Sequence, residues 1–413
     1  MSVAGEITDR LYNPRDPAVI ADPFPALRRL QEDGPIHWSP ALKTWVVTRY
    51  EDCKRVALDP AFTAERMKAF FDYLPPQKRD KVKNLEWSIG LWAVFLDPPD
   101  HTRLRRLMSR GFTSRAIASM EPRILGIVDE LIDGIVARGS GEMEFIRDFA
   151  YPLPALVIME LLRMPRERLD DFKRWSDELV LFVGGALVTE EKYARAERAT
   201  NEMIAFFRGI TAERRRDLGD DMVSALITAE DAGDVLNEEE LIASCILLLF
   251  AGHETTKNLL ANGLLQLIRN PAQAERLRAD PTLAEAAVEE MLRIDGPSGG
   301  MVRVAREEVE MHGITIARGQ RIYAMQHAAN HDPAVFPDPD RFDIARANNR
   351  HITFGHGIHF CLGAPLARLE GKVAFPRLLQ RLTDIELAAE PQWLDSVIFR
   401  GMLALPLRFR PAD

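Results

Sequence analysis

Hydrophobic residues recur every three or four positions through the middle of the chain. Between residues 100 and 268, Leu, Ile and Val keep this spacing almost without interruption, which predicts a series of α-helices. Short β-branched segments predict strands nearer the two ends of the sequence, at residues 44–48, 302–304, 309–311 and 321–324. Residues 62–96 follow neither period, so we expect a long irregular segment there. The pattern therefore predicts a mainly α-helical fold with small β-sheets.

One predicted helix is much longer than the others. Asn237 followed by Glu240 is typical of a capping box at a helix N-terminus, and Pro271 stops the helical pattern after Asn270. The helix is about 33 residues long, or about 50 Å at 1.5 Å per residue, so we expect it to cross the middle of the protein. Its apolar run at residues 241–252 is shorter than the roughly 20 residues that span a membrane. The run therefore predicts a buried helix and no membrane span.

The composition favours one soluble domain. The 413 residues are 46% hydrophobic and 28% charged, without a Ser- or Gly-rich linker, so we expect a single domain over residues 1–413. A formal net charge of −9 disfavours a nucleic-acid partner. Cys53, Cys245 and Cys361 lie far apart, which favours a reducing cytoplasm over a disulfide framework. The acidic N-terminal segment MSVAGEITDR lacks the apolar core of a signal peptide, which also favours a cytoplasmic location.

The segment FGHGIHFCLG surrounds Cys361 with residues that suit a bound cofactor. Gly355 and Gly357 permit a tight turn and a close approach of the backbone to a flat molecule. The residues that follow favour a helix with Pro365 in its first turn. Cys361 is therefore expected at a helix N-terminus, where free N–H groups stabilise a thiolate.

Three other interpretations of this loop imply different chemistry. A dinucleotide-binding loop would need glycine in place of Phe360 and a βαβ unit around it. His356, His359 and Cys361 are types of residue that bind zinc, but no second ligand pair stands at zinc-finger spacing. A lone cysteine is most often a small apolar core residue, and only the flanking glycines and helix argue against that interpretation.

The pattern F-G-x-G-x-H-x-C-x-G, from Phe354 to Gly363, matches the haem-binding signature of the cytochrome P450 family at every fixed position. Other motifs of the family precede it in the family's order, and the chain resembles a bacterial, soluble member. The resemblance implies the cytochrome P450 fold, a helical bundle around haem with small β-sheets. It implies haem b (iron protoporphyrin IX) as cofactor, Cys361 as the axial metal ligand, and Phe354 and Gly355 beside the haem.

The middle of the long helix carries an unusual cluster, AGHETT, at residues 251–256. Lys257 stands where a helical zinc-protease motif requires a second histidine, which excludes that motif. Gly252 costs about 1 kcal/mol in a helix interior, so its presence calls for a reason. The alternative is that the glycine and the threonines simply weaken the helix at this point.

The family resemblance gives this cluster a function, because in similar proteins the stretch passes over the haem opposite the thiolate. It implies that Ala251 and Gly252 leave room for oxygen and substrate. It also implies that Thr255 hydrogen-bonds dioxygen or an ordered water, and that Glu254 passes protons inward. Peroxide-using relatives typically replace this pair, so Glu254 and Thr255 favour the oxygen-reducing route.

The resemblance also assigns residues to the haem propionates, which are anionic and need cationic donors. The four assigned donors are His101, Arg105, Arg303 and His359. A buried scaffold behind the haem is implied for Glu290, Arg293 and Arg341. Arg103 and Arg106 match no such position and are expected to face solvent.

The implied reaction inserts one oxygen atom from dioxygen into an unactivated C–H bond. The chain shows no flavin-binding or iron–sulfur cysteine pattern, so electrons are expected from a ferredoxin, or a flavodoxin, with an NAD(P)H-dependent reductase. Arg106 and Arg110 are candidates for docking that partner, and we expect a monomer. The alternatives on the same fold are a peroxide-driven peroxygenase and a haem-thiolate gas sensor or carrier.

The predicted substrate is a small apolar organic molecule, because the positions that match the family's pocket are mainly apolar or small. They draw on residues 70–96, the turn at residues 182–185 and several single positions. The single positions are Leu247, Leu248, Thr255, Gly300, Val302 and Phe399.

Overall fold

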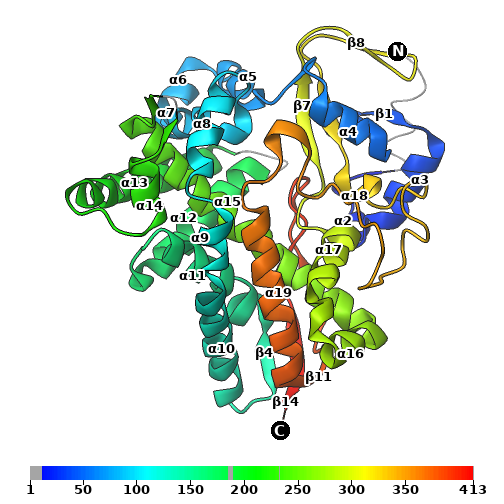
Figure 1. The fold of residues 1–413 in the computed structure, drawn as a ribbon. Helices are drawn as coiled ribbons and strands as arrows, with labels where there is room; N and C mark the ends of the chain where they lie inside the picture. The colour runs from blue at the N-terminus through cyan, green and yellow to red at the C-terminus, as the bar shows by residue number, and fades with distance from the viewer. Residues whose placement is uncertain (1–11, 185–188, 232, 413) are drawn as a thin grey trace. The chain divides into compact units, whose positions relative to one another are not determined.

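The computed structural model describes residues 12–184, 189–231 and 233–412 (Figure 1). The N-terminal segment considered above, and Gly185 of the predicted turn, lie outside these residues. Contacts along the chain divide it into two compact units. The first unit comprises Met1–Thr63, Ile124–Leu153 and Thr255–Asp413, and the second comprises Ala64–Arg123 and Pro154–Glu254.

The first unit contains a five-stranded sheet with the order β1-β2-β10-β7-β3. The strands β2 and β10 are parallel, and the other neighbouring pairs are antiparallel. The alternation of the strands buries Val47, Ala305 and Ile322 in one apolar cluster on this sheet. The strands are β1 (Ile36–Ser39), β2 (Thr44–Val47), β3 (Phe62–Thr63), β7 (Met301–Ala305) and β10 (Arg321–Ala324). The strands predicted at residues 44–48, 302–304 and 321–324 are confirmed.

Smaller sheets complete the β structure of the first unit. A three-stranded sheet has the order β11-β14-β4. Two further sheets have two strands each: β8 pairs with β9, and β12 pairs with β13. The predicted strand at residues 309–311 is confirmed as β8. The strands are β4 (Glu142–Glu144), β8 (Val309–Met311), β9 (Ile314–Ile316), β11 (Leu382–Leu387), β12 (Gln392–Trp393), β13 (Met402–Ala404) and β14 (Pro406–Pro411).

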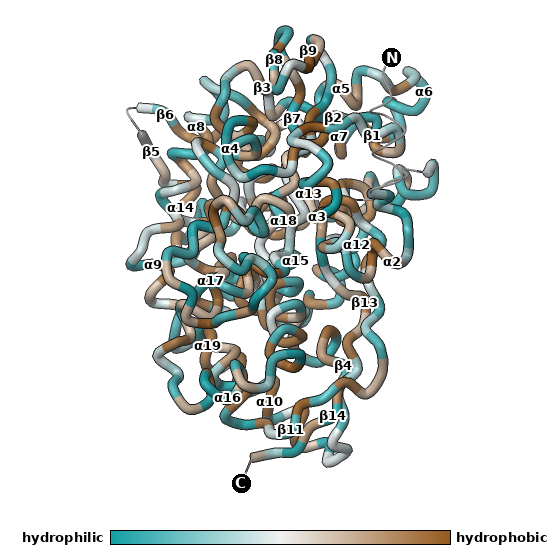
Figure 2. Tube along the Cα trace, turned by 90° about the vertical axis from the view of Figure 1, so that its right-hand side faces the viewer, coloured by the Kyte–Doolittle hydropathy of each residue, from teal (hydrophilic) through white to brown (hydrophobic). Residues whose placement is uncertain are grey.

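Two helices of the first unit, α10 and α19, lie side by side near the three-stranded sheet (Figure 1). Ion pairs join them, with Arg377 Nε 2.5 Å from Asp129 Oδ1 and Arg381 Nη2 2.6 Å from Asp133 Oδ1. Hydrophobic and hydrophilic positions alternate along α10 (Figure 2), as expected of a helix with one buried face. The helices wholly within this unit are α2 (Pro17–Ala21), α3 (Phe24–Asp33), α4 (Tyr50–Leu58), α16 (Pro271–Ala279), α17 (Ala284–Asp295), α18 (Gln326–Ala329) and α19 (Ala364–Arg381).

The second unit consists mainly of helices. The prediction of a long irregular segment at residues 62–96 is wrong. Short helices fill most of it; α5 and α7 bury apolar residues, but each helix is too short to show a clear period in the sequence. The helices wholly within this unit are α5 (Arg66–Asp72), α6 (Pro76–Arg79), α7 (Lys83–Gly90), α8 (Asp100–Ser109), α9 (Ser114–Ala118), α12 (Leu169–Gly184), α13 (Glu190–Arg216) and α14 (Met222–Ile227). A two-residue ladder joins β5 (Glu230–Asp231) to β6 (Asp234–Val235). Three helices cross a boundary between the units: α10 (Glu121–Ala137), α11 (Pro152–Leu161) and α15 (Glu238–Arg269).

The long helix α15 has 32 residues, close to the length of about 33 expected from the sequence. Its capping box is formed, since the Asn237 N–H donates to Glu240 Oε2 at 3.0 Å and the Glu240 N–H donates to Asn237 Oδ1 at 2.9 Å. Residues 241–250 are all buried, which confirms the apolar run as a buried helix. Within the described part of the chain, no helix is both long enough and apolar enough to cross a membrane. The mainly α-helical fold with small sheets is confirmed.

The buried acid of the predicted scaffold, Glu290 of α17, is fully enclosed by hydrogen-bond donors. Arg293 donates to both carboxylate oxygens at 2.8 Å, and Arg346 Nε donates at 3.0 and 3.1 Å. Asn349 and the Asp343 N–H add two more hydrogen bonds at 3.0 Å. The fully buried charge of Glu290 is therefore neutralised by two guanidinium groups.

The predicted third member of this scaffold, Arg341, does not contribute its side chain. The Arg341 side chain is 65% exposed and lies 3.7 Å from Asp343. Its carbonyl oxygen instead accepts hydrogen bonds from Arg293 and Arg346, at 3.2 and 2.6 Å. The turn points the backbone of Arg341 inward and its side chain outward, so the side chain of Arg346 binds Glu290 where the family resemblance implied Arg341.

Replacing Arg293 by Ala is expected to lower the free energy of unfolding by roughly 3–5 kcal/mol, because a buried carboxylate loses its closest partner. Arg341→Ala keeps the backbone carbonyl and should change the free energy by about 0.5 kcal/mol or less. Urea unfolding at neutral pH measures both. Equal losses from the two variants would restore Arg341 as a member of the buried cluster.

Candidate functional site

The loop before α19 folds as the two glycines of the signature predict. Gly355 and Gly357 have φ values of 77° and 69°, a region that strongly favours glycine. A Cβ on Gly357 would also lie 2.8 Å from Cδ2 of Leu58. The turn is closed by the Cys361 N–H, which donates to the Phe354 carbonyl at 2.9 Å. The structure therefore brings Phe354, Gly355 and Cys361 together in one short turn.

Cys361 differs from the other two cysteines in ways that favour a thiolate. It is half-buried and lies three residues before α19, whose positive N-terminal end stabilises negative charge. Cys53 and Cys245 are fully buried. Burial raises the pKa of Cys245 to about 12, with a smaller effect from Asp221, and raises the pKa of Cys53 well above its usual value. These two thiols stay protonated at neutral pH, so Cys361 is the candidate metal ligand among the three cysteines.

An ion pair lies against the aromatic ring of this loop, on residues that the sequence alone did not single out. Arg368 of α19 donates two hydrogen bonds to Glu289 of α17, from Nε at 2.6 Å and from Nη2 at 2.9 Å. Its guanidinium carbon lies 4.6 Å from the centre of the Phe354 ring. His351 Nε2 lies 3.1 Å from the same carboxylate. The sequence carries only weak signals for these positions: Glu289 is adjacent to Glu290, and Arg368 lies in the helix predicted after Cys361.

The first unit also holds two of the predicted propionate donors. Arg303 lies in β7, is 8% exposed, and has its backbone opposite Ile322 of β10. His359 ends a short 3₁₀ turn, Gly357–His359, two residues before Cys361, and is half-buried. Each is held on a regular element that fixes its direction.

In the second unit, α8 carries the other two predicted propionate donors. His101 is 2% exposed and Arg105 is half-buried, and the four-residue spacing places both on one face of the helix. Arg106 and Arg110 are exposed, as predicted for Arg106. The prediction for Arg103 is wrong, because its side chain is only 27% exposed and pairs with Asp234 and with the capping carboxylate of α15.

The centre of α15 changes from buried to accessible at the predicted cluster. Leu247 and Leu248 are buried, whereas Ala251 is exposed and Thr255, one turn later, is half-buried. Gly252 has a packing reason of its own, since a Cβ there would lie 3.0 Å from Cδ1 of Ile158 on α11. The small side chain at Ala251 thus marks an accessible side of the helix, while Gly252 accommodates a neighbouring helix.

Glu254 is a buried acid in this cluster. It is 2% exposed, and its Oε2 atom lies 4.0 Å from Nε2 of His253. His253 is fully buried, and its Nδ1 atom donates to the Leu249 carbonyl at 3.1 Å. Because Nδ1 donates that hydrogen bond, Nε2 is the ring nitrogen that faces the acid. The helix therefore places an acid and a second proton-binding group in its dry interior.

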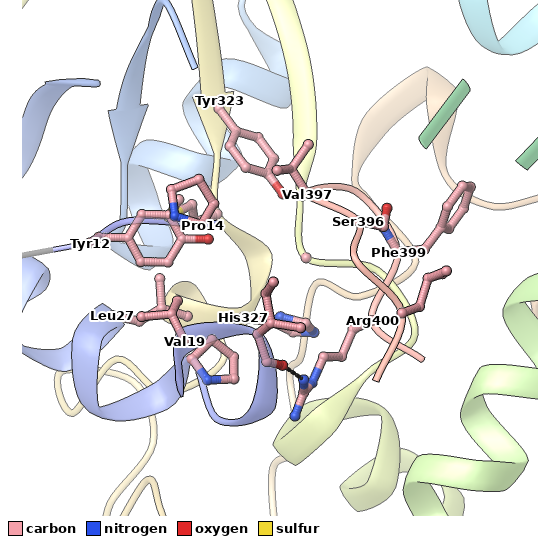
Figure 3. Close-up of a pocket in the computed structure, with 15 residues that line it drawn as sticks. Tyr12, Pro14, Val19, Leu27, Tyr323, His327, Ser396, Val397, Phe399 and Arg400 are labelled. Atoms are coloured by element: carbon pink, nitrogen blue, oxygen red, sulfur yellow. Dashed lines mark hydrogen bonds between the residues drawn. The ribbon is translucent and has the colours of Figure 1, made fainter. Parts of the chain in front are cut away.

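One predicted substrate position of the first unit, Phe399, lines a small pocket between the N-terminal and C-terminal segments (Figure 3). Figure 3 shows Tyr12, Val19 and Leu27 on the side opposite Val397 and Phe399. The cavity has a volume of about 50 Å³. Ligand sites for drug-sized molecules have about 300–1,000 Å³, so this pocket has room for water only.

Two further predicted lining positions follow the strand β7. Val302 is half-buried in the strand, and Gly300 is buried just before it. A Cβ on Gly300 would lie 2.2 Å from the Ala324 carbonyl, so the close approach of β10 requires glycine there. The sequence had suggested that this glycine leaves space for a substrate, whereas the backbone of Ala324 fills that space.

The donor set fits haem b. A half-buried cysteine at a helix N-terminus suits an axial thiolate, and the positive-φ glycines keep Cβ atoms away from the backbone of its turn. Arg303 and His101 are buried cations or donors on rigid elements, as the anionic propionates need.

Comparison with known proteins identifies the class. The family model for cytochrome P450 matches residues 38–386, and the chain belongs to the cytochrome P450 family. It is a cytochrome P450 monooxygenase with haem b as its cofactor, and the family uses dioxygen, a substrate and redox partners.

Curated relatives are similar over nearly the whole chain. Cytochrome P450 107B1 of Saccharopolyspora erythraea is 40% identical, with 98% of both chains covered. Cytochrome P450 monooxygenase PikC of Streptomyces venezuelae is 38% identical, with 94% of this chain and 92% of PikC covered. The solved structure of P450BioI in complex with hexadec-9Z-enoic acid ligated acyl carrier protein has a TM-score of 0.88 and 36% identity, covering 95% of this chain and all of that one. The match is therefore to whole proteins of this family.

Glu289 is expected to make stability depend on acid pH. Burial raises its pKa, but the hydrogen bonds from His351 and Arg368 outweigh burial and lower the pKa from 4.5 to about 2. A lowered pKa gives stability that is present above pH 4.5 and lost as the pH falls toward 2. Glu289→Gln should therefore flatten the fall of the urea midpoint between pH 4.5 and 2.

Glu370 provides the matched control, because burial raises its pKa well above the usual value of 4.5. A raised pKa gives stability below pH 4.5 that is lost as the pH rises, so Glu370→Gln should act with the opposite sign. An unchanged pH profile for Glu289→Gln would show that the ion pair with Arg368 does not form in solution.

Proposed function

We propose that the protein is a haem-thiolate monooxygenase that inserts one oxygen atom from dioxygen into a C–H bond of a small apolar organic substrate. The second oxygen atom leaves as water, and two electrons and two protons balance the reaction. The observation that carries the proposal is Cys361, a half-buried thiol at a helix N-terminus within the family's haem-binding loop. We propose that residues 1–413 act as one monooxygenase domain, since the family match runs through every segment of both units.

Cys361 is the axial ligand in this proposal. When bound, the haem supplies the site at which dioxygen is bound and activated. The helix dipole of α19 and the fixed turn keep the sulfur ionised and correctly directed. Phe354 and Gly355 lie beside the cofactor on the same turn.

Four residues bind the propionates in this proposal: His101, Arg105, Arg303 and His359. Their support is the match to the family's positions, together with the burial of His101 and Arg303. A buried donor loses less side-chain entropy on binding than an exposed one, and water competes less for its hydrogen bonds. His101 and Arg303 are therefore the stronger propionate donors.

Glu254 and Thr255 form the proton path in this proposal. Glu254 is a buried acid, 2% exposed, one residue before the hydroxyl of Thr255 on α15. The half-buried Thr255 carries the hydroxyl that passes the proton onward. Ala251 precedes them on the accessible side of α15 and leaves room there for oxygen and substrate, whereas Gly252 packs against Ile158.

The substrate class follows from the lining. Leu247, Leu248, Val302 and Phe399 are apolar, and Gly300 adds no polar group, although the Ala324 backbone fills the space beside it. They suit a hydrocarbon surface without a buried charge. The P450BioI structure holds hexadec-9Z-enoic acid on acyl carrier protein, an example of an alkyl chain accepted by a similar fold.

The electron donor in this proposal is a ferredoxin, or a flavodoxin, served by an NAD(P)H-dependent reductase in the cytoplasm. Arg106 and Arg110 on and after α8 are exposed cations that suit the acidic surface of such a partner. Rim charges of this kind change association rates and salt dependence more than they change turnover.

Isotope-labelled dioxygen tests this function with a substrate chosen from apolar compounds that shift the haem spin state. With ferredoxin, reductase and NAD(P)H, one labelled atom is expected in the product and one in water. Glu254→Gln should lower product formation about a hundredfold while NAD(P)H is still consumed, because general acid catalysis contributes about 10²–10⁴. Glu238→Gln, an exposed acid at the start of α15, is the matched control and should behave as the wild type.

Unlabelled product would contradict the oxygen-insertion route. Turnover driven by added peroxide without ferredoxin would favour a peroxygenase instead, and binding of dioxygen without any product would favour a sensor or carrier.

A further inference from the structure

The ring of Phe354, at the start of the Cys361 turn, is covered on one side by a charged assembly of Glu289, His351 and Arg368. The Arg368 guanidinium lies over the Phe354 ring at 4.6 Å, within the range of a cation–π interaction. The backbone of the same phenylalanine accepts the Cys361 N–H at 2.9 Å. Phe354 therefore contacts Arg368 through its ring and Cys361 through its carbonyl oxygen.

Arg368 is fixed in position by its partner. Its two hydrogen bonds to Glu289, at 2.6 and 2.9 Å, form the parallel pair that suits guanidinium and carboxylate. The planar fork can hold the carboxylate along its edge while its face lies on the ring, and a lysine cannot do both. The contact joins α17 to α19 and orients the guanidinium plane against Phe354.

His351 ties the same carboxylate to the backbone that leads into the turn. The Thr353 N–H donates to His351 Nδ1 at 3.3 Å, so Nδ1 acts as an acceptor and Nε2 carries the proton. Nε2 then donates to Glu289 at 3.1 Å. The His351 side chain is 2% exposed, which leaves it little freedom to move. Glu289 therefore binds both His351, three residues before Phe354, and Arg368, which lies over the Phe354 ring.

The charge balance of the assembly argues against a role as an electrostatic docking site. The Arg368 side chain is 34% exposed, but its charge is paired with Glu289, which is 23% exposed. The hydrogen bonds of the pair hold the pKa of Glu289 at about 2, so the carboxylate stays ionised at neutral pH. A cation neutralised in this way adds little long-range attraction for an acidic partner.

We propose that Glu289, His351 and Arg368 are positioning residues that fix Phe354 and, through its carbonyl, hold the turn that presents the Cys361 sulfur to the haem iron. The assembly thereby maintains thiolate ligation and the reduction potential of the iron. This inference rests on the proposed assignment of Cys361 as the axial ligand.

The test uses the purified holoenzyme with single substitutions. Arg368→Gln removes the cation, Arg368→Lys keeps the charge but loses the fork, and Glu289→Gln removes the partner. Arg377→Gln is the matched control, since Arg377 lies on the same helix, is 33% exposed and pairs with Asp129 at 2.5 Å, away from the turn. Urea unfolding of each variant identifies any general loss of stability.

Two properties of the haem are measured. The first is the rate at which the red-shifted Soret band of the reduced carbon monoxide complex converts to that of a neutral thiol on mild warming. The second is the midpoint potential of the iron. Arg368→Gln and Glu289→Gln are expected to convert about fivefold faster than wild type, the equivalent of about 1 kcal/mol. Both should shift the potential in the same direction, with Arg368→Lys intermediate and Arg377→Gln unchanged.

The results that would contradict the role of Arg368 differ from those that would contradict Cys361 as the axial ligand. A wild-type protein without the red-shifted band would overturn the assignment of Cys361 and the proposed function with it. A wild-type band with Arg368 variants that match Arg377→Gln would overturn this inference alone. Variants with a raised KM for ferredoxin, but an unchanged band and potential, would make Arg368 a docking residue and would also overturn it.

Discussion

The hydrogen bond from the Cys361 N–H to the Phe354 carbonyl is the contact on which the site depends. It closes a turn that only glycine conformations at residues 355 and 357 allow, and it leaves the sulfur at the positive end of α19. A thiolate needs that electrostatic support, because burial alone raises the pKa of a thiol, as it does for Cys245. The helix, the turn and the half-buried position thus act together on one atom.

Two buried or half-buried acids of α17 depend on electrostatic support in the same way, since donors surround each carboxylate. Glu290 has two guanidinium partners, and Glu289 beside it has Arg368 and His351. Removing one partner would leave a charge without compensation in a dry site, which is far more costly than losing an exposed pair. The consecutive acids of α17 thereby serve two purposes, one in the scaffold and one against the haem-binding turn.

The sequence was most informative where the chemistry is local. The glycines, Pro365 and Cys361 stand within twelve residues of one another, so spacing alone predicted the turn and the helix that follows. The capping box at Asn237 and Glu240 was predictable for the same reason. The long helix and the strands β2, β7, β8 and β10 followed from their patterns, whereas the other strands are too short to show one.

Contacts between distant segments could not be predicted in this way. The choice of Arg346 over Arg341 depends on which way a turn points its side chains. The pairing of Arg103 with the cap of α15 joins residues 137 positions apart. The glycines at residues 252 and 300 could be read as space for a ligand, because only the structure reveals that Ile158 and the Ala324 carbonyl occupy that space.

The central claim is that Cys361 supplies the thiolate that binds the haem iron. The most direct measurement is the absorption spectrum of the reduced protein with carbon monoxide, compared between wild type, Cys361→Ala and Cys245→Ala. The account predicts a strongly red-shifted Soret band in the wild type and in Cys245→Ala, and loss of that band in Cys361→Ala. A red-shifted band that persists in Cys361→Ala would contradict the account.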